Sequence, residues 1–518
     1  MTHHCLVSHV YVWSTQLEKY IERPHHIEFQ VLAGANATTG TIETVVFPER
    51  ECSIQRRNQK VIEESPSCML HESTRQAMAD QVHKLCQAVG YESAGTVEFL
   101  VDEEQNFYFL EMNTRLQVEH PITEAICGVD LVKGMLWVGA GWGLPQDYHQ
   151  VIQTGDMGGS RIMPHTGHAV EARIYAEDPV RGFLPSIGPL TPYVEPRTHN
   201  PTERGESYIR LDSGVAAGAP VTPHYDPMLA KLVSYAPERQ AAIDGLTNAL
   251  DEYVIQGVQH NALLIQSVLR QPSFQAGDTP TSFLPTHYPD GFHGVELTVP
   301  EQEEFAVAAA IIAVNRREWL QQPPLAGKTD DASSTAIVRL GGLFGTAFSV
   351  LLGEASATVA AVVDGSIATE RTIHLDGPQG YEPDRYLANV TLDGKTRDIQ
   401  VLGEVTTGEI RMQMCGANLH VLIQSPREFE LSTHMQEPIP ADTSDSVLSP
   451  MPGTLISYAV AEGDTVQEGQ ELCIVEAMKM QNIVRASRPG KIASCRVEVG
   501  SSLQSDEIII EFEPKVDE

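Results

Sequence analysis

The most constraining feature of the sequence is an internal repeat near its C-terminal end. The Pro-Gly pair at 452–453 recurs at 489–490, and Gly463 recurs as Gly500, at one offset of 37 residues. Two copies of one β-unit, each too small to bury its apolar face alone, would close on each other into a small barrel or sandwich. The seam between the copies is centred on Lys479, so we expect this lysine in a hairpin at the end of the barrel.

The residue pattern divides the rest of the chain into segments. Short β-type runs alternate with a helical run at Glu72–Val89, a second helix is expected near Ala241–Tyr253, and acidic residues open a third helix at Pro300 that should end near Gln321. From about residue 335 to 423 the pattern is all β, with turns expected at Asp364-Gly365 and Asp393-Gly394. We therefore expect domains at 1–160, 161–290, 291–435 and 447–518, with a polar linker at 436–446.

Charge and cysteine usage exclude several classes of protein. The 69 acidic and 35 basic residues leave a net charge of −34, which argues against nucleic acid or an anionic membrane as the main partner. Eight cysteines without CxxC spacing indicate free thiols in a reducing compartment and no zinc site. The longest apolar stretch, Ala306–Val314, is too short to span a bilayer. The first fifteen residues contain no Lys or Arg and resemble neither a signal peptide nor a transit peptide.

A candidate catalytic segment spans residues 95–119. Two β-type runs flank a polar turn near 102–106, which predicts a hairpin with Glu98 opposite Glu111. Two facing carboxylates repel unless a cation lies between them, and carboxylates with an amide oxygen suit Mg²⁺. A charged, solvent-exposed face is the alternative that the spacing leaves open. As long as the chain stays extended, side chains alternate between the two faces of the strand. One face would then carry Glu111, Asn113, Arg115, Gln117 and Glu119.

Lys479 would be an ordinary solvated turn lysine if it stood alone. Met478 and Met480 flank it, which is unusual at an exposed tip unless an apolar group docks there. The run Glu476–Met480 resembles the biotinylation sequence of biotin carboxyl carrier domains, with Ser449–Gly453 in the expected upstream place. A lipoyl domain shares this architecture but usually lacks the two methionines. The resemblance therefore implies covalent biotin on Lys479.

The run EMNTRLQVEHP, which begins at Glu111, resembles the metal and bicarbonate segment of biotin carboxylases in the ATP-grasp superfamily. A guanidinium fork can hold a planar anion, and an adjacent carboxylate can take its proton. The resemblance implies Glu98, Glu111 and Asn113 as ligands of Mg²⁺ or Mn²⁺, Arg115, Gln117 and Val118 as bicarbonate contacts, and Glu119 as general base.

The resemblance extends in both directions along the chain. Residues 18–28 resemble the hinge that contacts the nucleotide in biotin carboxylases, and residues 52–60 resemble the run on the substrate side of their active site. Residues 171–178 resemble the family segment whose arginine stabilises the enolate of biotin. A lone arginine would otherwise be a surface charge. The implied roles are ATP binding for Glu18, Lys19, Ile21, His26, Gln55 and Asn58, bicarbonate binding for Lys60, and biotin stabilisation for Arg173. Many biotin carboxylases carry His where this chain has Asn58, whereas the propionyl-CoA type often carries Asn.

From Leu17 onward the chain resembles the α subunits of propionyl-CoA carboxylases, and the methylcrotonyl type fits less well. The resemblance implies an α+β multidomain protein: a partial ATP-grasp biotin carboxylase, a docking domain of one helix with an antiparallel β-barrel, and an all-β biotinyl domain with a flattened-barrel fold. It also implies ATP and bicarbonate as substrates, a carboxyltransferase β subunit and biotin protein ligase as partners in a hetero-oligomer, and the mitochondrial matrix or, in bacteria, the cytoplasm as location.

Part of the family pattern is expected upstream of Leu17. That part contains a lysine pair for the ATP phosphates and a glycine-rich lid, and Gly158-Gly159 is a short and misplaced candidate for the lid. Because phosphoryl transfer depends on positioning and charge neutralisation, we expect little autonomous ATP-driven carboxylation. Two hypotheses follow: a carboxylase subunit, or a biotin carrier and assembly module attached to an inactive carboxylase remnant.

Overall fold

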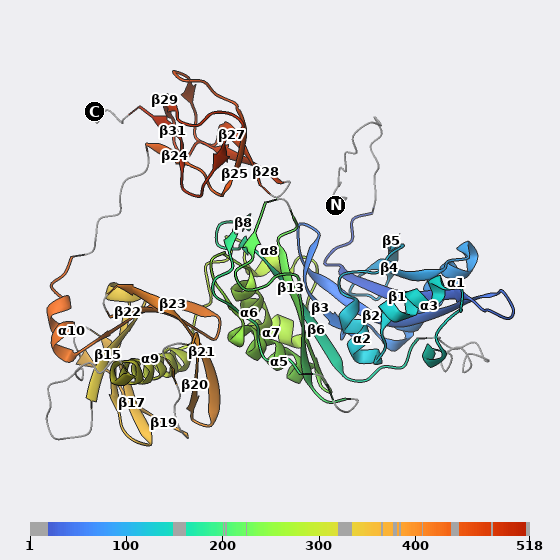
Figure 1. Ribbon diagram of the computed structural model, residues 1–518, viewed down its shortest axis with the longest axis horizontal. Coiled ribbons are helices and arrows are strands. Elements are labelled where there is room, and N and C mark those ends of the chain that lie inside the picture. Colours follow the sequence, from blue (N-terminus) through green and yellow to red (C-terminus); the bar gives the residue numbers. More distant parts are fainter. Residues whose placement is uncertain are drawn as a thin grey trace.

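The computed structural model describes residues 19–148, 162–199, 201, 205–223, 225–319, 334–363, 366–376, 381–382, 385–406, 408–436, 445–477 and 480–513. Figure 1 shows three bodies in chain order: an N-terminal portion with one large sheet and several helices, a barrel around a long helix, and a small C-terminal domain. None of the described helices is long and apolar enough to cross a bilayer. The seven described cysteines are free thiols, and Cys5 lies outside the described residues.

One antiparallel sheet of eight strands forms the centre of the first body, in the order β11-β13-β6-β3-β2-β1-β4-β5. The sheet crosses the expected domain boundary at residue 160, because β3 pairs with β6. The β-type runs that the sequence predicts at Ile27–Leu32, Gly95–Val101 and Phe107–Met112 lie within β1, β4 and β5. The strands are β1 (His25–Ala35), β2 (Ile42–Arg56), β3 (Gln59–Ser65), β4 (Ser93–Val101), β5 (Phe107–Asn113), β6 (His168–Tyr175), β11 (Tyr208–Ser213) and β13 (Met228–Ala236).

Helices bury apolar stripes against this sheet. Helix α1 has the predicted bounds, Glu72–Val89, and its buried Met78, Val82 and Cys86 recur every four residues against β1 and β2. Helix α5 begins two residues before the predicted Ala241 and packs on β6 and β13. The other helices are α2 (His120–Cys127), α3 (Leu131–Gly139), α6 (Ala262–Arg270), α7 (Pro272–Ala276) and α8 (Phe283–His287), with a 3-10 turn at Gln146–Tyr148. Short strands are β7 (Glu177–Asp178), β8 (Leu184–Pro185), β9 (Gly188–Pro189), β10 (Tyr193–Val194), β12 (Pro220–Val221) and β14 (Val254–Ile255).

The second body is a nine-stranded sheet that curves around α9 (Val299–Trp319), as Figure 1 shows. Every residue from Phe305 to Ala313 is buried, because strands surround this alanine-rich stretch and small side chains let them approach. The predicted Asp393-Gly394 turn joins β20 to β21, and both residues have the positive φ that a type I′ turn requires. The predicted Asp364-Gly365 turn lies outside the described residues. The elements are β15 (Ser334–Leu340), η2 (Gly342–Phe344), β16 (Thr346–Leu352), β17 (Ser356–Val363), β18 (Ser366–Ile367), β19 (Arg371–His374), β20 (Leu387–Leu392), β21 (Lys395–Thr406), β22 (Glu409–Met414), β23 (Ala417–Gln424) and α10 (Pro426–Ser432).

The C-terminal domain consists of two four-stranded sheets that enclose one core. Its strand bounds repeat at the predicted offset, since β25, β26 and β27 begin 37 residues before β29, β30 and β31. Gly463 and Gly500 share a φ of 90°, so the two copies also turn alike. The predicted two-fold β-unit is confirmed. The strands are β24 (Ser446–Leu448), β25 (Gly453–Tyr458), β26 (Thr465–Val466), β27 (Glu471–Ala477), β28 (Met480–Arg485), β29 (Gly490–Cys495), β30 (Ser502–Leu503) and β31 (Ile508–Phe512).

Candidate active site

A cavity of about 1290 Å³, called the central cavity below, opens on one face of the eight-stranded sheet beside α6 and α8. Most of the residues that the sequence singled out line it together: His26, Gln55, Asn58, Lys60, Glu98, Glu111, Asn113, Arg115, Gln117, Val118, Glu119 and Arg173. Lys19 and Ile21 are not among its lining residues. Lys19 is exposed and donates to the Tyr108 hydroxyl at 2.8 Å. Glu18 lies outside the described residues.

Glu98 and Glu111 are directly opposite each other on β4 and β5, so the predicted register is confirmed. The expected alternation holds as far as Asn113 and is wrong for the later residues, because β5 ends there. Arg115 and Glu119 instead reach the cavity from the loop that follows β5. The loop is held by side-chain contacts within the site rather than by a strand ladder.

The Asn113 amide joins the two facing carboxylates. Its Nδ2 lies 3.0 Å from Glu98 Oε1 and 3.1 Å from Glu111 Oε1. A half-turn of this amide would present its oxygen to the same point, because the O and N ends are nearly alike in shape. Three oxygen ligands would then converge, which fits the preference of Mg²⁺. Glu28 also lies near Glu98 and His26, but Arg50 and Lys60 already contact its carboxylate.

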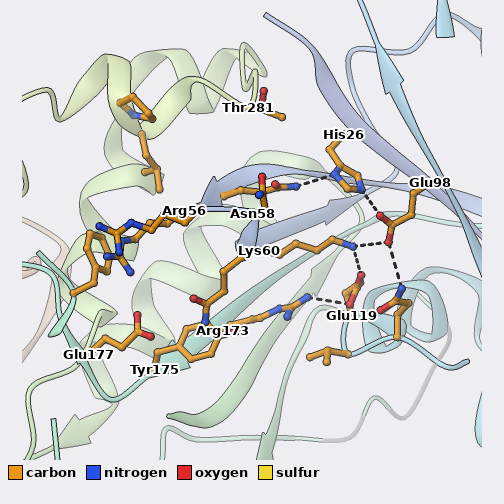
Figure 2. A pocket seen from close by; sticks show the side chains of 18 of the residues that line it. His26, Arg56, Asn58, Lys60, Glu98, Glu119, Arg173, Tyr175, Glu177 and Thr281 are labelled. Atoms are coloured by element: carbon orange, nitrogen blue, oxygen red, sulfur yellow. Dashed lines mark hydrogen bonds and ion pairs between the residues drawn. The ribbon is translucent and has the colours of Figure 1, made fainter. Parts of the chain in front are cut away.

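Lys60 is the central cation of the cavity. Its ammonium lies 2.5 Å from Glu28, 2.6 Å from Glu119 and 3.3 Å from Glu98, as Figure 2 shows for the last two. Burial alone would lower the pKa of Lys60, but the surrounding carboxylates, Glu28 above all, raise it well above its ordinary value. Burial likewise opposes ionisation of Glu98, yet contacts with His26 and Lys60 lower its pKa to about 2. These groups are therefore charged at neutral pH.

Arg173 contacts Glu119 from the opposite side. Its Nη2 donates to Glu119 Oε2 at 3.0 Å, and its Nε donates to Glu63 Oε1 at 2.5 Å. Glu119 is fully buried, with one oxygen toward Lys60 and the other toward Arg173. A carboxylate held in this way at the wall of the cavity is placed to accept a proton from a bound group.

The turn between β2 and β3 brings the predicted nucleotide contacts to the cavity. Arg57 and Asn58 both have positive φ, 48° and 66°, as a two-residue type I′ hairpin requires. Gln55 Nε2 lies 2.9 Å from His26 Nδ1, and His26 Nε2 lies 3.0 Å from Glu98 Oε2. This chain of contacts fixes the His26 ring between the turn and the carboxylate pair.

The predicted bicarbonate contacts are held by their neighbours. Arg115 Nη1 donates to the Gln117 side-chain oxygen at 3.1 Å, and Gln117 Nε2 donates to Glu98 at 3.3 Å. The Val118 carbonyl accepts from Lys231 at 3.0 Å. The Arg115 side chain is exposed at the cavity, and its contacts with described residues engage Nη1, which leaves its other donors for an anion.

Sequence reasoning missed three buried charged residues behind the cavity. Arg50 is fully buried on β2, opposite Glu28 on β1, and donates to it at 2.5 Å. Glu63 and Glu171, both fully buried, lie behind Arg173. Charged residues inside β-type runs were a possible signal, but the partners became visible only once the strand order was known.

The biotinylation candidate Lys479 lies outside the described residues. The strands on either side are described: β27 ends at Ala477, β28 begins at Met480, and these two residues pair with each other. Two residues of sequence therefore separate paired strands, which agrees with the predicted hairpin at the repeat seam.

Four family models match successive parts of the chain. They are the carbamoyl-phosphate synthase L chain ATP-binding domain at 9–147, the biotin carboxylase C-terminal domain at 171–286, the propionyl-coenzyme A carboxylase BT domain at 305–437, and the biotin-requiring enzyme family at 445–512.

Known proteins with similar sequences cover nearly the whole chain. The propionyl-CoA carboxylase alpha chain of Ruegeria pomeroyi is 43% identical over 96% of this chain and 71% of its own length. The human mitochondrial counterpart is 40% identical over 96% of this chain and 64% of its length, so the chain spans about two thirds of such relatives. The mouse methylcrotonoyl-CoA carboxylase subunit alpha is 31% identical. A biotin carboxylase domain of Hydrogenobacter thermophilus 2-oxoglutarate carboxylase, solved with MgADP and bicarbonate, is 41% identical over 52% of this chain and 54% of its own, with a TM-score of 0.45.

Proposed function

Because the chain belongs to the family of propionyl-CoA carboxylase alpha chains, we propose that it carries biotin on Lys479 and carboxylates it. The reaction uses ATP and bicarbonate, and a partner carboxyltransferase β subunit passes the carboxyl group to propionyl-CoA. The observation that carries this proposal is the buried Glu119 carboxylate, held between Lys60 and Arg173 at the central cavity.

The contacts support a division of labour in the cavity. When bound, Mg·ATP would activate bicarbonate and biotin would supply the nitrogen that accepts the carboxyl group. Glu119 then takes the bicarbonate proton, since its oxygens face the cavity cations. Arg115 holds the planar anion in its fork, and Arg173 stabilises negative charge on the acceptor. Glu98, Glu111 and Asn113 would hold the metal ion, and the turn at Gln55–Asn58 would contact the nucleotide.

The barrel around α9 is proposed to dock the β subunit, because it has apolar surface and no place in the central cavity. Phe344 and Leu431 are 46% and 52% exposed on this barrel. Replacing an interface apolar anchor by Asp costs on the order of 2 kcal/mol or more. Phe344→Asp and Leu431→Asp together should weaken co-purification with the β subunit at least about tenfold. The control is Val89→Asp, at an exposed position on α1. If the double variant and this control bind the β subunit equally well, the docking surface lies elsewhere.

Biotin attachment is tested by intact mass after co-expression with a biotin protein ligase. The wild-type chain should gain the mass of one biotin, and Lys479→Arg should gain none. Lys491→Arg, at an exposed lysine on β29 of the same domain, is the matched control and should be labelled normally. Biotin on the Lys479→Arg chain would refute the assignment.

An assay of ATP-dependent carboxylation on the same biotinylated protein distinguishes the carrier hypothesis from the enzyme hypothesis. If the assembled protein is biotinylated and binds the β subunit but shows no ATP-dependent carboxylation, the chain is a carrier and assembly module. We place the enzyme in the mitochondrial matrix of a eukaryotic source, as for the mitochondrial relatives, or in the cytoplasm of a bacterial one.

A further inference from the structure

Two acidic side chains lie next to each other behind the Arg173 guanidinium. Glu63 on β3 and Glu171 on β6 are directly opposite in the antiparallel ladder, and both are fully buried. Like charges at opposed positions of neighbouring strands destabilise a sheet. Their burial makes the repulsion stronger, because no solvent screens it. Such a pair is tolerated when it is not fully ionised.

Hydrogen bonding around the pair is incomplete. Arg173 Nε donates to one oxygen of Glu63 at 2.5 Å. The other Glu63 oxygen and both Glu171 oxygens have no hydrogen-bond partner among the described residues. A buried ionised carboxylate without donors is costly, so a proton is the simplest way to lower that cost. Burial raises the pKa of Glu63 to about 7, and burial together with the charge of Glu63 raises the pKa of Glu171 well above its ordinary value.

The charged groups that face the pair come from four elements. Lys60 on β3 already contacts Glu28, Glu98 and Glu119. Lys231 on β13 pairs with Asp212 and donates to the Val118 carbonyl. Glu119, in the loop after β5, shares Arg173 with Glu63. Arg173 on β6 is therefore the one cation in the described part of the chain that forms an ion pair with either acid, and it must balance Glu119 as well.

We propose that Glu63 and Glu171 together retain one proton, mainly on Glu171, and that this pair positions Arg173 against Glu119 with its charge directed to the central cavity. Glu63 is the more easily ionised of the two because Arg173 donates to it, whereas neither Glu171 oxygen has a donor among the described residues. Loss of the proton would add a negative charge behind Arg173 and weaken its hold on an anion in the cavity. The consequence for catalysis rests on the proposed function, but the retained proton does not.

Infrared spectroscopy of the full chain tests the retained proton directly. The wild-type chain should show a protonated-carboxyl band at pH 8, above the pKa of Glu63, that Glu171→Gln removes and Glu63→Gln keeps. Asp251→Asn, at another acid with a raised pKa but outside the cavity, controls for unrelated bands and should leave this one in place. Should Glu171→Gln not fold, Glu171→Met, of similar length, takes its place. If the protonated-carboxyl band is the same in the wild-type and Glu171→Gln spectra, the proposal is overturned.

The positioning role is tested by the pH profile of carboxylation in the assembled enzyme. Glu171→Gln should match the wild-type rate at pH 7 and decline less toward pH 9. Glu63→Gln removes a charge-assisted contact to Arg173 and should lower kcat about tenfold or more at every pH. Equal pH profiles for wild type and Glu171→Gln would overturn the positioning role. Full activity in Arg173→Ala would instead overturn the proposed function and leave the infrared result standing.

Discussion

The central cavity and the C-terminal domain use charged residues in opposite ways. Behind the cavity, the Arg50–Glu28 pair is fully shielded from solvent. In the C-terminal domain, Lys491 and Glu513 form a pair whose side chains are 49% and 52% exposed. Buried charges cost several kcal/mol each unless they are paired, whereas exposed pairs contribute little. The body around the central cavity therefore keeps costly buried charges, which fits its proposed role in holding anions. The C-terminal domain needs only a stable core to present the lysine that we propose carries biotin.

The largest expected effect is the loss of one partner in the buried network. Arg50→Ala leaves Glu28, Gln30 and Thr123 without their common donor. We expect a loss of about 3–5 kcal/mol in the free energy of unfolding, because a buried carboxylate loses its main counter-charge. Urea unfolding followed by the fluorescence of Trp137 and Trp142, which contact each other in the same body, measures it.

The matched control for Arg50→Ala is Arg496→Ala in the C-terminal domain, whose side chain is 57% exposed and pairs with Glu511. It should cost less than about 1 kcal/mol in that domain. Similar losses for the two variants would contradict the contrast between the two regions.

A smaller effect, of opposite sign, is expected at Asp251, a buried acid that forms no ion pair among the described residues. Burial raises the pKa of Asp251 from 3.8 to about 7, and Gln266 donates to its carboxylate. The folded chain thus binds this proton more tightly than the unfolded chain does, so the resulting stability is complete below about pH 4 and is lost as the pH rises through 7. Asp251→Asn should stabilise the protein at pH 8 by on the order of 2 kcal/mol.

The pH dependence of unfolding checks this prediction. The wild-type free energy of unfolding should fall between pH 4 and 7 more steeply than that of Asp251→Asn. Parallel curves would show that Asp251 titrates normally.

The smallest effect concerns the exposed pair of the C-terminal domain. Lys491→Ala should change the stability of that domain by less than about 1 kcal/mol, and raising the salt concentration should reduce the difference further. Amide hydrogen exchange in β29 and β31 measures it. A change above 2 kcal/mol would mean that surface charge matters more in this domain than the contrast allows.

Local patterns predicted much of the fold. The α1 bounds, the Glu98–Glu111 register and the repeat around Lys479 follow from helix periodicity, a polar turn and self-similarity, which all act over short sequence distances. The asparagine of the expected metal set also lies between the two carboxylates.

The sequence pattern could not predict which strands lie next to each other in the sheet. Glu28 contacts Arg50 and Lys60 because β1, β2 and β3 are neighbours, and Glu63 faces Glu171 because β3 pairs with β6 across more than one hundred residues. The order of strands in a sheet depends on the packing of the whole core, so no local pattern specified it. The same pairing explains why the sheet continues across residue 160.

The central claim is tested most directly by the transfer of labelled carbon from bicarbonate to propionyl-CoA, measured after assembly with a carboxyltransferase β subunit, the partner that we propose. The account predicts ATP-dependent incorporation by the wild type and by Lys491→Arg. Lys479→Arg should abolish incorporation, and Glu119→Gln should reduce it by about a hundredfold or more, since a general base is lost. If Glu119→Gln incorporates label at the wild-type rate, the role proposed for the carboxylate between Lys60 and Arg173 is contradicted.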